Sequence, residues 1–488
     1  MEKLDTVTRI TKNIVFLLFS SVFMDIFSFI FNIYSVRYLG PKNFGIISFS
    51  LAFTDLFGIF FDFGLNQLTI REVAKNKKMA FKYLYNIQAI KMFISIIVSS
   101  LILFIAFISG YERQIIVVLG IITISSVIRA FSSTFTSIFR AFENMKYETI
   151  GTIIYGLSRL AGLLGIIVFR LNVVYFAFIY LLSSLVMLLY LMHIAIKNSL
   201  IPKLQIDFYF WKMTIREALP FAISSVFITI YYRIDSVMLS FMKGATEVGI
   251  YNAAYKLILP FNIIPSVIIG SLFPTMSQYY ANSSQDAFSK AFRYPFKYLL
   301  IISIPISVGI SILAKRFIIL LYGNEYLQSY SCLQILIWSE VLVFLNIALA
   351  NVFNSRDKQI VVSMQTGISA LFNLITNAIF IPRYSFIGAS YTTVATELLG
   401  FLFLYFKTLR ILDDKLFPRT FIVTLVRVIA ASLLMGFFLR FFEKLNVFLL
   451  VVLSIFLYFG TIYLLKSIDK DELNLIRKIL FRNYKGKN

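Results

Sequence analysis

Charged side chains lie inside several of the longest apolar segments of the sequence. Three of them are the cations Arg129, Arg233 and Lys256. A charge inside a membrane is costly, so such residues usually face the interior of a helix bundle or a water-filled cavity. Arginine offers a planar fork of donors and lysine a compact charge, and both bind anionic oxygens. We therefore expect these cations to line a cavity that binds an anionic group. The alternative is that they are paired struts between helices.

Acidic residues lie in similar segments and are candidates for binding a proton or Na⁺. Arg233 and Asp235 are two residues apart, so they cannot face each other on a helix, and each needs a partner on another helix. A cation without a partner is costly inside a membrane, so we expect the cations to lean on acids until a ligand replaces them. An acid released in this way is free to take up an ion. The candidates are Asp25, Asp55, Asp235, Glu340 and Glu397.

Polar stripes indicate which helix faces avoid lipid. Ser125 and Ser132 are spaced to share one helical face with Arg129, so this face is expected to border the cavity. Asn373 and Asn377 form a second stripe. Their amides are interpreted either as partners for ligand hydroxyl groups or as hydrogen bonds that join helices.

Two prolines, Pro260 and Pro265, interrupt the apolar segment at 250–277. Each removes an amide donor from the helix. We expect this helix to bend during opening and closing, with the two prolines as its hinge.

The composition is that of a polytopic membrane protein. Of the 488 residues, 59% are hydrophobic and 14% are charged, whereas a soluble domain is about 45–50% apolar. Apolar windows long enough to cross a bilayer number about fourteen. They are predicted at 14–38, 44–70, 83–109, 114–139, 151–169, 173–196, 217–242, 250–277, 296–314, 330–354, 360–381, 387–406, 419–439 and 446–465.

The sequence carries little that indicates an enzyme, a cofactor or a cleaved leader. Charges of both signs precede a first apolar run that is longer than that of a signal peptide, so the first helix is expected to stay. The single cysteine, Cys332, leaves no intramolecular disulfide. His/Cys clusters, phosphate loops and paired nucleophiles and bases are missing, so we expect no catalysis, no cofactor and no metal.

The distribution of positive charge predicts the orientation. Roughly 30 Lys and Arg residues fall on the side of the termini and about 10 on the opposite side, so the positive-inside rule places both termini in the cytoplasm. The net charge of +22 is then explained by topology and by contact with anionic lipids, not by nucleic-acid binding. Lys91, Asp62, Arg159 and Arg427 lie near expected cytoplasmic ends and are interpreted as struts or snorkelling side chains.

A short turn motif occurs twice. LGPKNFGI at 39–46 aligns with KGATEVGI at 243–250, and each copy stands between two long apolar segments. Copies in the same orientation imply two similar halves related by an axis along the membrane normal, with the binding site between them. We expect a six-helix half at 1–197, a cytoplasmic linker at 198–216, a second six-helix half at 217–410, two further helices at 411–466 and a cytoplasmic tail at 467–488.

Four segments carry a family resemblance: RYLGPKNFGIISFS at 37–50, DFGLNQLTIREVAKNK at 62–77, RIDSVMLSFMKGATEVGIYNAAYKL at 233–257 and LYGNEYLQSYSCLQIL at 321–336. Over nearly its whole length the chain resembles the polysaccharide transporters of the multidrug/oligosaccharidyl-lipid/polysaccharide (MOP) exporter superfamily. The resemblance implies an all-α polytopic protein of the cytoplasmic membrane, with two six-helix halves related by a parallel repeat and two extra C-terminal helices.

The resemblance also implies a function: a flippase that moves polyprenyl-pyrophosphate-linked oligosaccharides across the membrane by alternating access. Arg129, Arg233 and Lys256 would receive the pyrophosphate, and a proton or Na⁺ would be the coupling ion. Membrane lipids, the lipid-linked glycan and other polysaccharide assembly proteins would be its partners. Two alternatives stay open: an ion-coupled exporter of small amphipathic molecules in the same superfamily, and a membrane glycosyltransferase or polymerase. The second would need large loops outside the membrane, which the sequence lacks.

Overall fold

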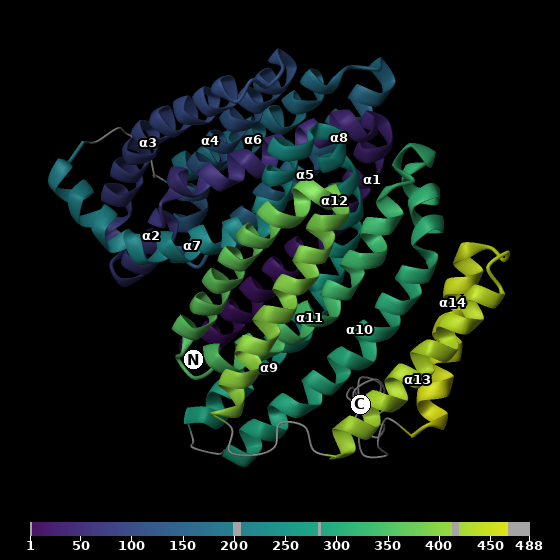
Figure 1. Cartoon of the computed structure of the whole chain (residues 1–488). Coiled ribbons are helices and arrows are strands. Elements are labelled where there is room, and N and C mark those ends of the chain that lie inside the picture. Colours follow the sequence, from purple (N-terminus) through teal and green to yellow (C-terminus); the bar gives the residue numbers. More distant parts are fainter. Residues whose placement is uncertain (1, 199–205, 282–284, 412–418, 467–488) are drawn as a thin grey trace, which may run out of the picture. The chain divides into compact units, whose positions relative to one another are not determined.

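The computed structural model describes residues 2–198, 206–281, 285–411 and 419–466, and every regular element in these ranges is a helix (Figure 1). The predicted all-α class is confirmed. The helices are α1 (Glu2–Asp62), α2 (Leu65–Lys75), α3 (Ala80–Ile108), α4 (Arg113–Ala141), α5 (Met145–Phe169), α6 (Val173–Lys197), α7 (Phe208–Lys243), α8 (Ala245–Ile258), α9 (Ile263–Ala281), α10 (Gln285–Tyr322), α11 (Ser329–Asn354), α12 (Gln359–Leu409), α13 (Arg419–Phe441) and α14 (Val447–Leu464). Short 3₁₀ helices are η1 (Lys77–Met79), η2 (Leu259–Asn262) and η3 (Asn324–Tyr326).

Many of these helices are suited to cross a membrane. Within the described ranges, 11 are long and apolar enough, and a bent pair inside α7 raises the number to 12 if it is one span. Two helices, α1 and α12, each contain a residue outside helical geometry, Gly40 and Ser385, where the sequence predicts turns between spans. The chain is a multi-span membrane protein, and the number of fourteen spans stays a prediction.

The prediction of one continuous helix at 44–70 is wrong, because helical geometry is interrupted between α1 and α2. Phe63 and Gly64 have φ angles of 48° and 76°, in the left-handed region that a continuing helix does not use. A Cβ on Gly64 would lie 2.6 Å from the carbonyl oxygen of Ala218, so α7 packs directly against the break. The geometry of the break therefore depends on tertiary packing, which hydropathy does not report.

The helix predicted at 250–277 is divided at its prolines. Pro260 lies in η2, which follows α8, and Pro265 lies near the start of α9. Proline lacks an amide donor and its ring clashes with the preceding helical turn, which accounts for the 3₁₀ segment. The hinge role of the two prolines stays a prediction.

The predicted linker at 198–216 is helical over its later part. α7 begins at Phe208, while residues 199–205 of the linker, like the tail at 467–488, lie outside the described residues. Asp207 caps α7, because its Oδ1 accepts a hydrogen bond from the Phe210 backbone N–H at 3.0 Å. This bond and the Lys82 ammonium, 3.2 Å from Oδ2, hold the pKa of the Asp207 carboxyl below its ordinary value.

The chain divides into two compact units. The first comprises Met1–Pro260, Leu321–Ser329 and Thr366–Thr392, and the second comprises Phe261–Leu320, Tyr330–Gln365 and Thr393–Asn488. Each has its own hydrophobic core. In the first unit one cluster joins α2, α3, α4, α6 and α7, and in the second another joins α9 to α11, the end of α12, α13 and α14. The domain boundaries predicted from the sequence stay predictions.

The two turn motifs predicted as copies meet inside the first unit. A Cβ on Gly45 would lie 1.7 Å from the Ala245 carbonyl oxygen, and one on Gly249 would lie 2.0 Å from the Pro41 carbonyl oxygen. Only glycine allows α1 and α8 to approach this closely. In the motif alignment Gly45 corresponds to Gly249, and Pro41 corresponds to Ala245, so the contact is reciprocal, as across a local two-fold axis. A repeat that extends over whole halves stays a prediction.

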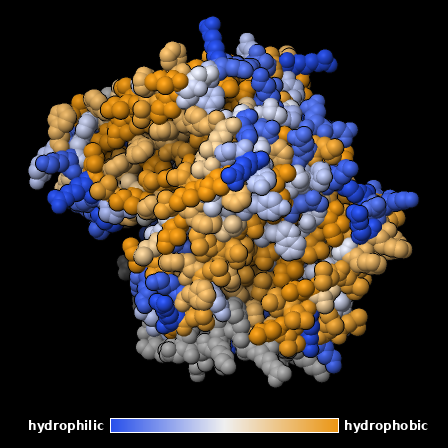
Figure 2. Space-filling view, in the orientation of Figure 1, coloured by the Kyte–Doolittle hydropathy of each residue, from blue (hydrophilic) through white to orange (hydrophobic). Residues whose placement is uncertain are grey.

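The surface fits a lipid environment. Large hydrophobic side chains on α3, such as Phe93, Ile97 and Phe104, are more than half exposed. Figure 2 shows hydrophobic residues over much of the visible face, with hydrophilic side chains gathered mainly toward its margins. In water this area would be a liability, whereas hydrocarbon solvates it.

Candidate functional site

A cavity of about 540 Å³ opens in the first unit between α1, α4, α7, α8 and η2. It combines apolar walls with a few charged and hydroxyl groups, which is the usual composition of a binding site. The residues that line it are Asp55, Gly58, Ile59, Phe61, Asp62, Gly64, Ser126, Arg129, Ala130, Ser133, Ser225, Ile228, Thr229, Tyr232, Arg233, Tyr255 and Leu259.

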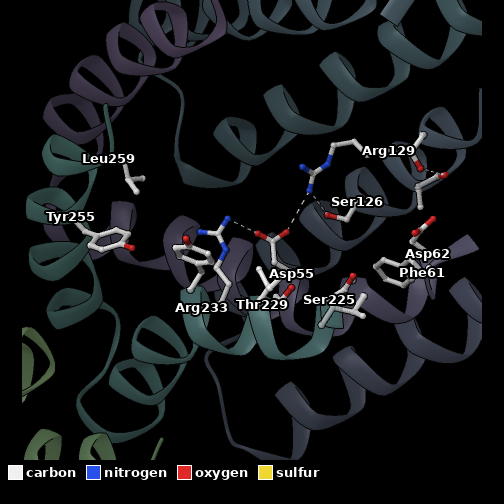
Figure 3. A pocket seen from close by; sticks show the side chains of 17 residues that line it. Asp55, Phe61, Asp62, Ser126, Arg129, Ser225, Thr229, Arg233, Tyr255 and Leu259 are labelled. Atoms are coloured by element: carbon white, nitrogen blue, oxygen red, sulfur yellow. Dashed lines mark hydrogen bonds and ion pairs between the residues drawn. The ribbon is translucent and has the colours of Figure 1, made fainter. Parts of the chain in front are cut away.

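Two of the three predicted cations face this cavity, and one carboxylate holds both. Asp55 Oδ2 lies 3.0 Å from Arg233 Nη2, and its Oδ1 lies 3.8 Å from Arg129 Nη2. Figure 3 shows the two guanidinium groups reaching Asp55 from opposite sides. Their side chains are 40% and 39% exposed. The carboxylate therefore bridges α4 and α7, and an anion in the cavity could reach the same N–H donors.

The face of α4 that lines the cavity is one residue away from the predicted stripe. Arg129 Nη2 donates a hydrogen bond to Ser126 Oγ at 2.8 Å, and Ser133 also lines the cavity. Ser125 is buried instead, with its hydroxyl 2.8 Å from that of Ser184 on α6. Ser132 is buried and bonds back to the carbonyl of Ile128. Periodicity located the helix face to within one residue, which is about 100° of helix rotation.

Lys256, the third predicted cation, lies on α8 and is half-buried. Within the described residues it forms no ion pair. It is not one of the cavity-lining residues.

A second charged cluster adjoins the cavity at Asp62, which is one of the lining residues. Lys91 on α3 is completely buried, and its ammonium is 2.9 Å from Asp62 Oδ1. The same ammonium donates hydrogen bonds to Asn66 Oδ1 and the Ala130 carbonyl, both at 2.9 Å. Lys91 is therefore a paired strut, one of the two interpretations expected from the sequence. It ties α3 to the ends of α1 and α2 beside their break and to α4.

Asp235 lies in a third cluster, away from Arg233. Its Oδ2 accepts a hydrogen bond from the Tyr251 hydroxyl at 2.7 Å, and its Oδ1 accepts one from Asn377 Nδ2 at 2.6 Å. Asn377 also donates to Asn373 Oδ1 at 2.8 Å, and the Thr392 hydroxyl donates to Asn377 Oδ1. The expectation that Arg233 and Asp235 find partners on other helices is confirmed. Asn377 therefore joins α12 to α7, as one of the two interpretations held, and Asn373 accepts a hydrogen bond from it on the same helix.

The other predicted acids are not brought to the cavity. Asp25 is exposed on α1. Glu340 and Glu397 belong to the second unit, where Glu397 Oε2 accepts from Asn346 Nδ2 at 2.9 Å. Glu340 is buried, and its Oε2 has no hydrogen-bond partner within the described part of the chain. Over the same part, no group of three His, Cys, Asp or Glu residues is arranged to hold a metal ion.

The second unit contains a cavity of about 400 Å³ with a nearly uniform hydrophobic lining. It lies between α10, α13 and α14, with Phe261 of η2 in its wall. Tyr458, one of its few polar residues, turns its hydroxyl toward the Ile301 carbonyl at 2.7 Å. The other lining residues are Ile301, Ile302, Pro305, Ile306, Gly309, Ile310, Leu313, Phe317, Met435, Leu439, Val451, Ser454, Ile455 and Phe459. Hydropathy alone does not reveal this cavity, because apolar residues that face a cavity and apolar residues that face lipid have the same hydropathy.

Comparison with known proteins adds a family and a fold. A family model described as polysaccharide biosynthesis protein matches residues 10–280, and one described as MatE matches residues 220–379. The chain is 24% identical over 384 residues to an uncharacterized membrane protein, MJ1068, of Methanocaldococcus jannaschii, which covers 75% of this chain and 74% of that protein. It is 20% identical over 171 residues to the probable low-salt glycan biosynthesis flippase Agl15 of Haloferax volcanii, which covers 35% of this chain and 36% of that protein. The structure of a lipid II flippase, MurJ, in an inward closed conformation superposes with a TM-score of 0.73 at 15% identity, covering 96% of this chain and 99% of that one.

Proposed function

Since the chain belongs to the polysaccharide biosynthesis protein family, within the MOP exporter superfamily, we propose that it is a flippase for polyprenyl-pyrophosphate-linked oligosaccharides. The observation that carries this proposal is the pair of arginines that share Asp55 in a cavity inside a membrane bundle. The similarity to proteins named as flippases, Agl15 and MurJ, supports the same function.

The polar part of such a substrate would bind in the first unit. A pyrophosphate that enters the cavity would compete with Asp55 for Arg129 and Arg233, with Lys256 adding attraction. Charge-assisted hydrogen bonds from arginine to phosphate oxygens are short and strong. The glycan would fill the remaining polar space, where Ser126, Thr229 and Tyr255 offer hydrogen bonds.

The apolar part would bind in the second unit. The cavity between α10, α13 and α14 has the polarity that a polyprenyl chain requires. The gain from burying hydrocarbon there is modest, because lipid solvates the same chain. Its role would be to select the shape of the tail and not to supply most of the affinity.

The proposed mechanism is alternating access coupled to an ion. Asp55 displaced from its arginines would be free to take up a proton or Na⁺. The Asp235 cluster is the second candidate, because one carboxylate, two amide side chains and two hydroxyls meet there. Bending at Pro260 and Pro265 would accompany the transition. Both termini would lie in the cytoplasm of a cell whose surface glycan depends on the protein.

Reconstitution tests the function directly. Purified protein in liposomes should accelerate the transbilayer movement of a fluorescent polyprenyl-pyrophosphate oligosaccharide, and Arg233→Ala should slow this movement by roughly 30-fold while inserting normally. The proposal would be refuted if the labelled lipid stayed in one leaflet of liposomes that contain correctly folded wild-type protein.

A second candidate is an ion-coupled exporter of small amphipathic molecules. The observation in its favour is the MatE model match over residues 220–379. Resistance to cationic dyes on expression, without any effect on surface glycan after deletion of the gene, would favour this alternative.

A further inference from the structure

We infer that the Asp62 end of the first unit's cavity is the subsite for the sugars next to the diphosphate, and that it favours neutral sugars over acidic ones. This inference rests on the proposed function. It divides the cavity into two levels with different tasks. At the arginine level, Arg129 and Arg233 hold the diphosphate. At the sugar level, Asp62 and Ser225 bind hydroxyl groups of the sugars.

Contacts between α1 and α7 show that the two levels are separate. Asp55 on α1 lies 3.0 Å from Arg233 on α7. Further along α1, a Cβ on Gly64 would lie 2.6 Å from the Ala218 carbonyl oxygen. Residue numbers rise along α1 and fall along α7, so the two helices are antiparallel here. Asp62 is seven residues after Asp55, which places it on the same helix face and about 10 Å further along the axis, toward Gly64.

The hydroxyl groups of α7 follow the same order. Ser225 and Thr229 precede Arg233 by eight and four residues, so the three side chains share one face, and all of them line the cavity. Ser225 is exposed, and its hydroxyl donates to the Phe221 carbonyl at 3.0 Å, which leaves the oxygen free to accept. The Thr229 hydroxyl forms no hydrogen bond within the described ranges. In Figure 3, Ser225 and Asp62 lie on the side of the view away from Arg233.

Lys91 balances the charge of Asp62 but leaves its oxygens without a hydrogen-bond donor. The ammonium lies 2.9 Å from Asp62 Oδ1. An ammonium has three N–H donors, and these bond to Asn66 Oδ1 and the Ala130 carbonyl at 2.9 Å and to Ser133 Oγ at 3.3 Å. Asp62 Oδ1 is buried without a hydrogen-bond partner among the described residues, and none of them donates to Oδ2. The carboxylate is therefore neutralised but still needs donors.

A hydroxyl group is the donor that fits this acceptor. The Asp62 side chain is 31% exposed and lines the cavity, so a ligand there can reach Oδ2. Hydrogen bonds from hydroxyl groups to an ionised carboxylate are short and strong. A sugar carboxylate would find no donor at this position, because Lys91 is completely buried and its N–H groups are taken. It would also meet the like charge of Asp62.

The arginine level has the opposite preference. There two cations, Arg129 and Arg233, share the carboxylate of Asp55, so an anion is attracted. At the sugar level the charges of Lys91 and Asp62 cancel. A diphosphate sugar should therefore bind in one orientation, with its diphosphate at the arginines and its sugars toward Asp62.

The test measures binding of three synthetic probes to the purified full chain in nanodiscs by calorimetry. The probes are geranyl diphosphate, the same diphosphate linked to glucose, and the same diphosphate linked to glucuronic acid. Wild type should bind the glucose probe about tenfold more tightly than the glucuronic acid probe, because only the acid meets like charge at Asp62. Asp62→Asn should bring these two affinities to within about twofold, since the amide keeps a polar group without the charge.

A second variant tests the hydroxyl groups without touching the ion pair. Ser225→Ala should lower the affinity for the glucose probe about threefold relative to geranyl diphosphate, because a hydrogen bond to the sugar is lost. The matched control is Ser109→Ala. Ser109 is also exposed and donates to a carbonyl four residues earlier, at 2.8 Å, but it does not line the cavity. Its ratio of affinities should equal that of wild type.

Each outcome supports or overturns the inference. Equal binding of the glucose and glucuronic acid probes by wild type, or the wild-type preference in Asp62→Asn, would overturn it and leave the arginine level standing. If Asp62→Asn does not fold, Ser225→Ala carries the test, and a wild-type ratio in this variant counts against the inference. Failure of the proposed function looks different: wild type would bind none of the three probes, or Arg233→Gln would bind all of them as wild type does.

Discussion

The two cavities of the molecule differ in what they offer a ligand. The one in the first unit presents Arg129, Arg233 and Asp55 from three helices, whereas the one in the second unit presents almost only hydrocarbon. Inside a membrane, an apolar cavity gives a ligand little that lipid does not already give, while a charged cavity gives it something that lipid lacks. The polar cavity should therefore decide whether a molecule is bound, and the apolar cavity should decide which tail fits.

The largest expected effect is removal of a cation from the polar cavity. Arg233→Ala leaves Asp55 with one distant partner and removes a donor for the anion. Losing one member of a charged pair costs about 2–5 kcal/mol when it is buried, and the low end applies here because Arg233 is 39% exposed. We expect the flipping rate in liposomes to fall by roughly 30-fold.

Two further variants sharpen this prediction. Arg233→Lys should restore part of the rate, because the charge remains and the fork is lost. Lys42→Gln removes an exposed cation whose ammonium lies 3.6 Å from Glu112. This control variant should flip the lipid at the wild-type rate. A full rate in Arg233→Ala at normal protein levels would mean that the polar cavity does not contact the anion.

The next largest effect concerns stability. Lys91→Met would leave Asp62 without the ammonium and remove the hydrogen bond donors of Asn66 Oδ1 and the Ala130 carbonyl. Breaking a buried pair costs about 3–5 kcal/mol, and the 31% exposure of Asp62 favours the low end. Thermal unfolding in detergent should show a clearly lower midpoint. The double variant Lys91→Met with Asp62→Asn should recover part of the lost unfolding midpoint. If Lys91→Met alone unfolds at the wild-type midpoint, the cluster does not support the cavity wall.

Part of this site could be predicted from the sequence. Intramembrane cost singled out Arg129, Arg233 and Asp55, and helix geometry excluded a contact between Arg233 and Asp235. These arguments use only what a residue is and where a bilayer must lie. They do not tell which acid meets which cation, because that depends on how helices distant in the sequence pack.

The features that were not predicted from the sequence also depend on packing between distant helices. Arg159 stacks on Phe31 and Tyr180, which come from two other helices. The break at Phe63 and Gly64 is set by contact with α7 at Ala218. Hydropathy is a property of single residues averaged over a window, so it predicts spans well and contacts poorly. One available signal was the glycine at 64 followed by the polar Asn66 within an apolar segment.

A smaller effect is expected in the apolar cavity. Gly309 lines it, and a Cβ there would make ordinary contacts, 3.7 Å from Met435 Cε and 3.9 Å from Leu439 Cδ1. Gly309→Leu should therefore fold and partly fill the cavity. We expect the KM for a long-chain polyprenyl substrate to rise about threefold to tenfold, in line with a few methylene contacts of about 0.8 kcal/mol each at most. Binding of geranyl diphosphate should stay the same. Gly460→Ala on α14, where a Cβ would meet nothing within 4 Å, is the control, and equal kinetics for both variants would remove the apolar cavity from the mechanism.

The smallest effect should come from substitution of Asp207, which lies in neither cavity. This variant therefore serves as a reference for substitutions in the two cavities. Its carboxylate caps α7 and pairs with Lys82, and these contacts lower the pKa of the folded carboxyl. A lowered folded pKa means that this stabilisation is present above the ordinary carboxyl pKa and is lost as the pH falls through the folded value. Asp207→Asn retains a capping oxygen but loses the charge, so its unfolding midpoint should lie slightly below that of wild type at pH 7, and the gap should close toward pH 3. Flipping at pH 7 should stay normal in this variant. A gap that persists at pH 3 would assign the loss to the cap geometry, and impaired flipping would give the start of α7 a part in transport that neither cavity explains.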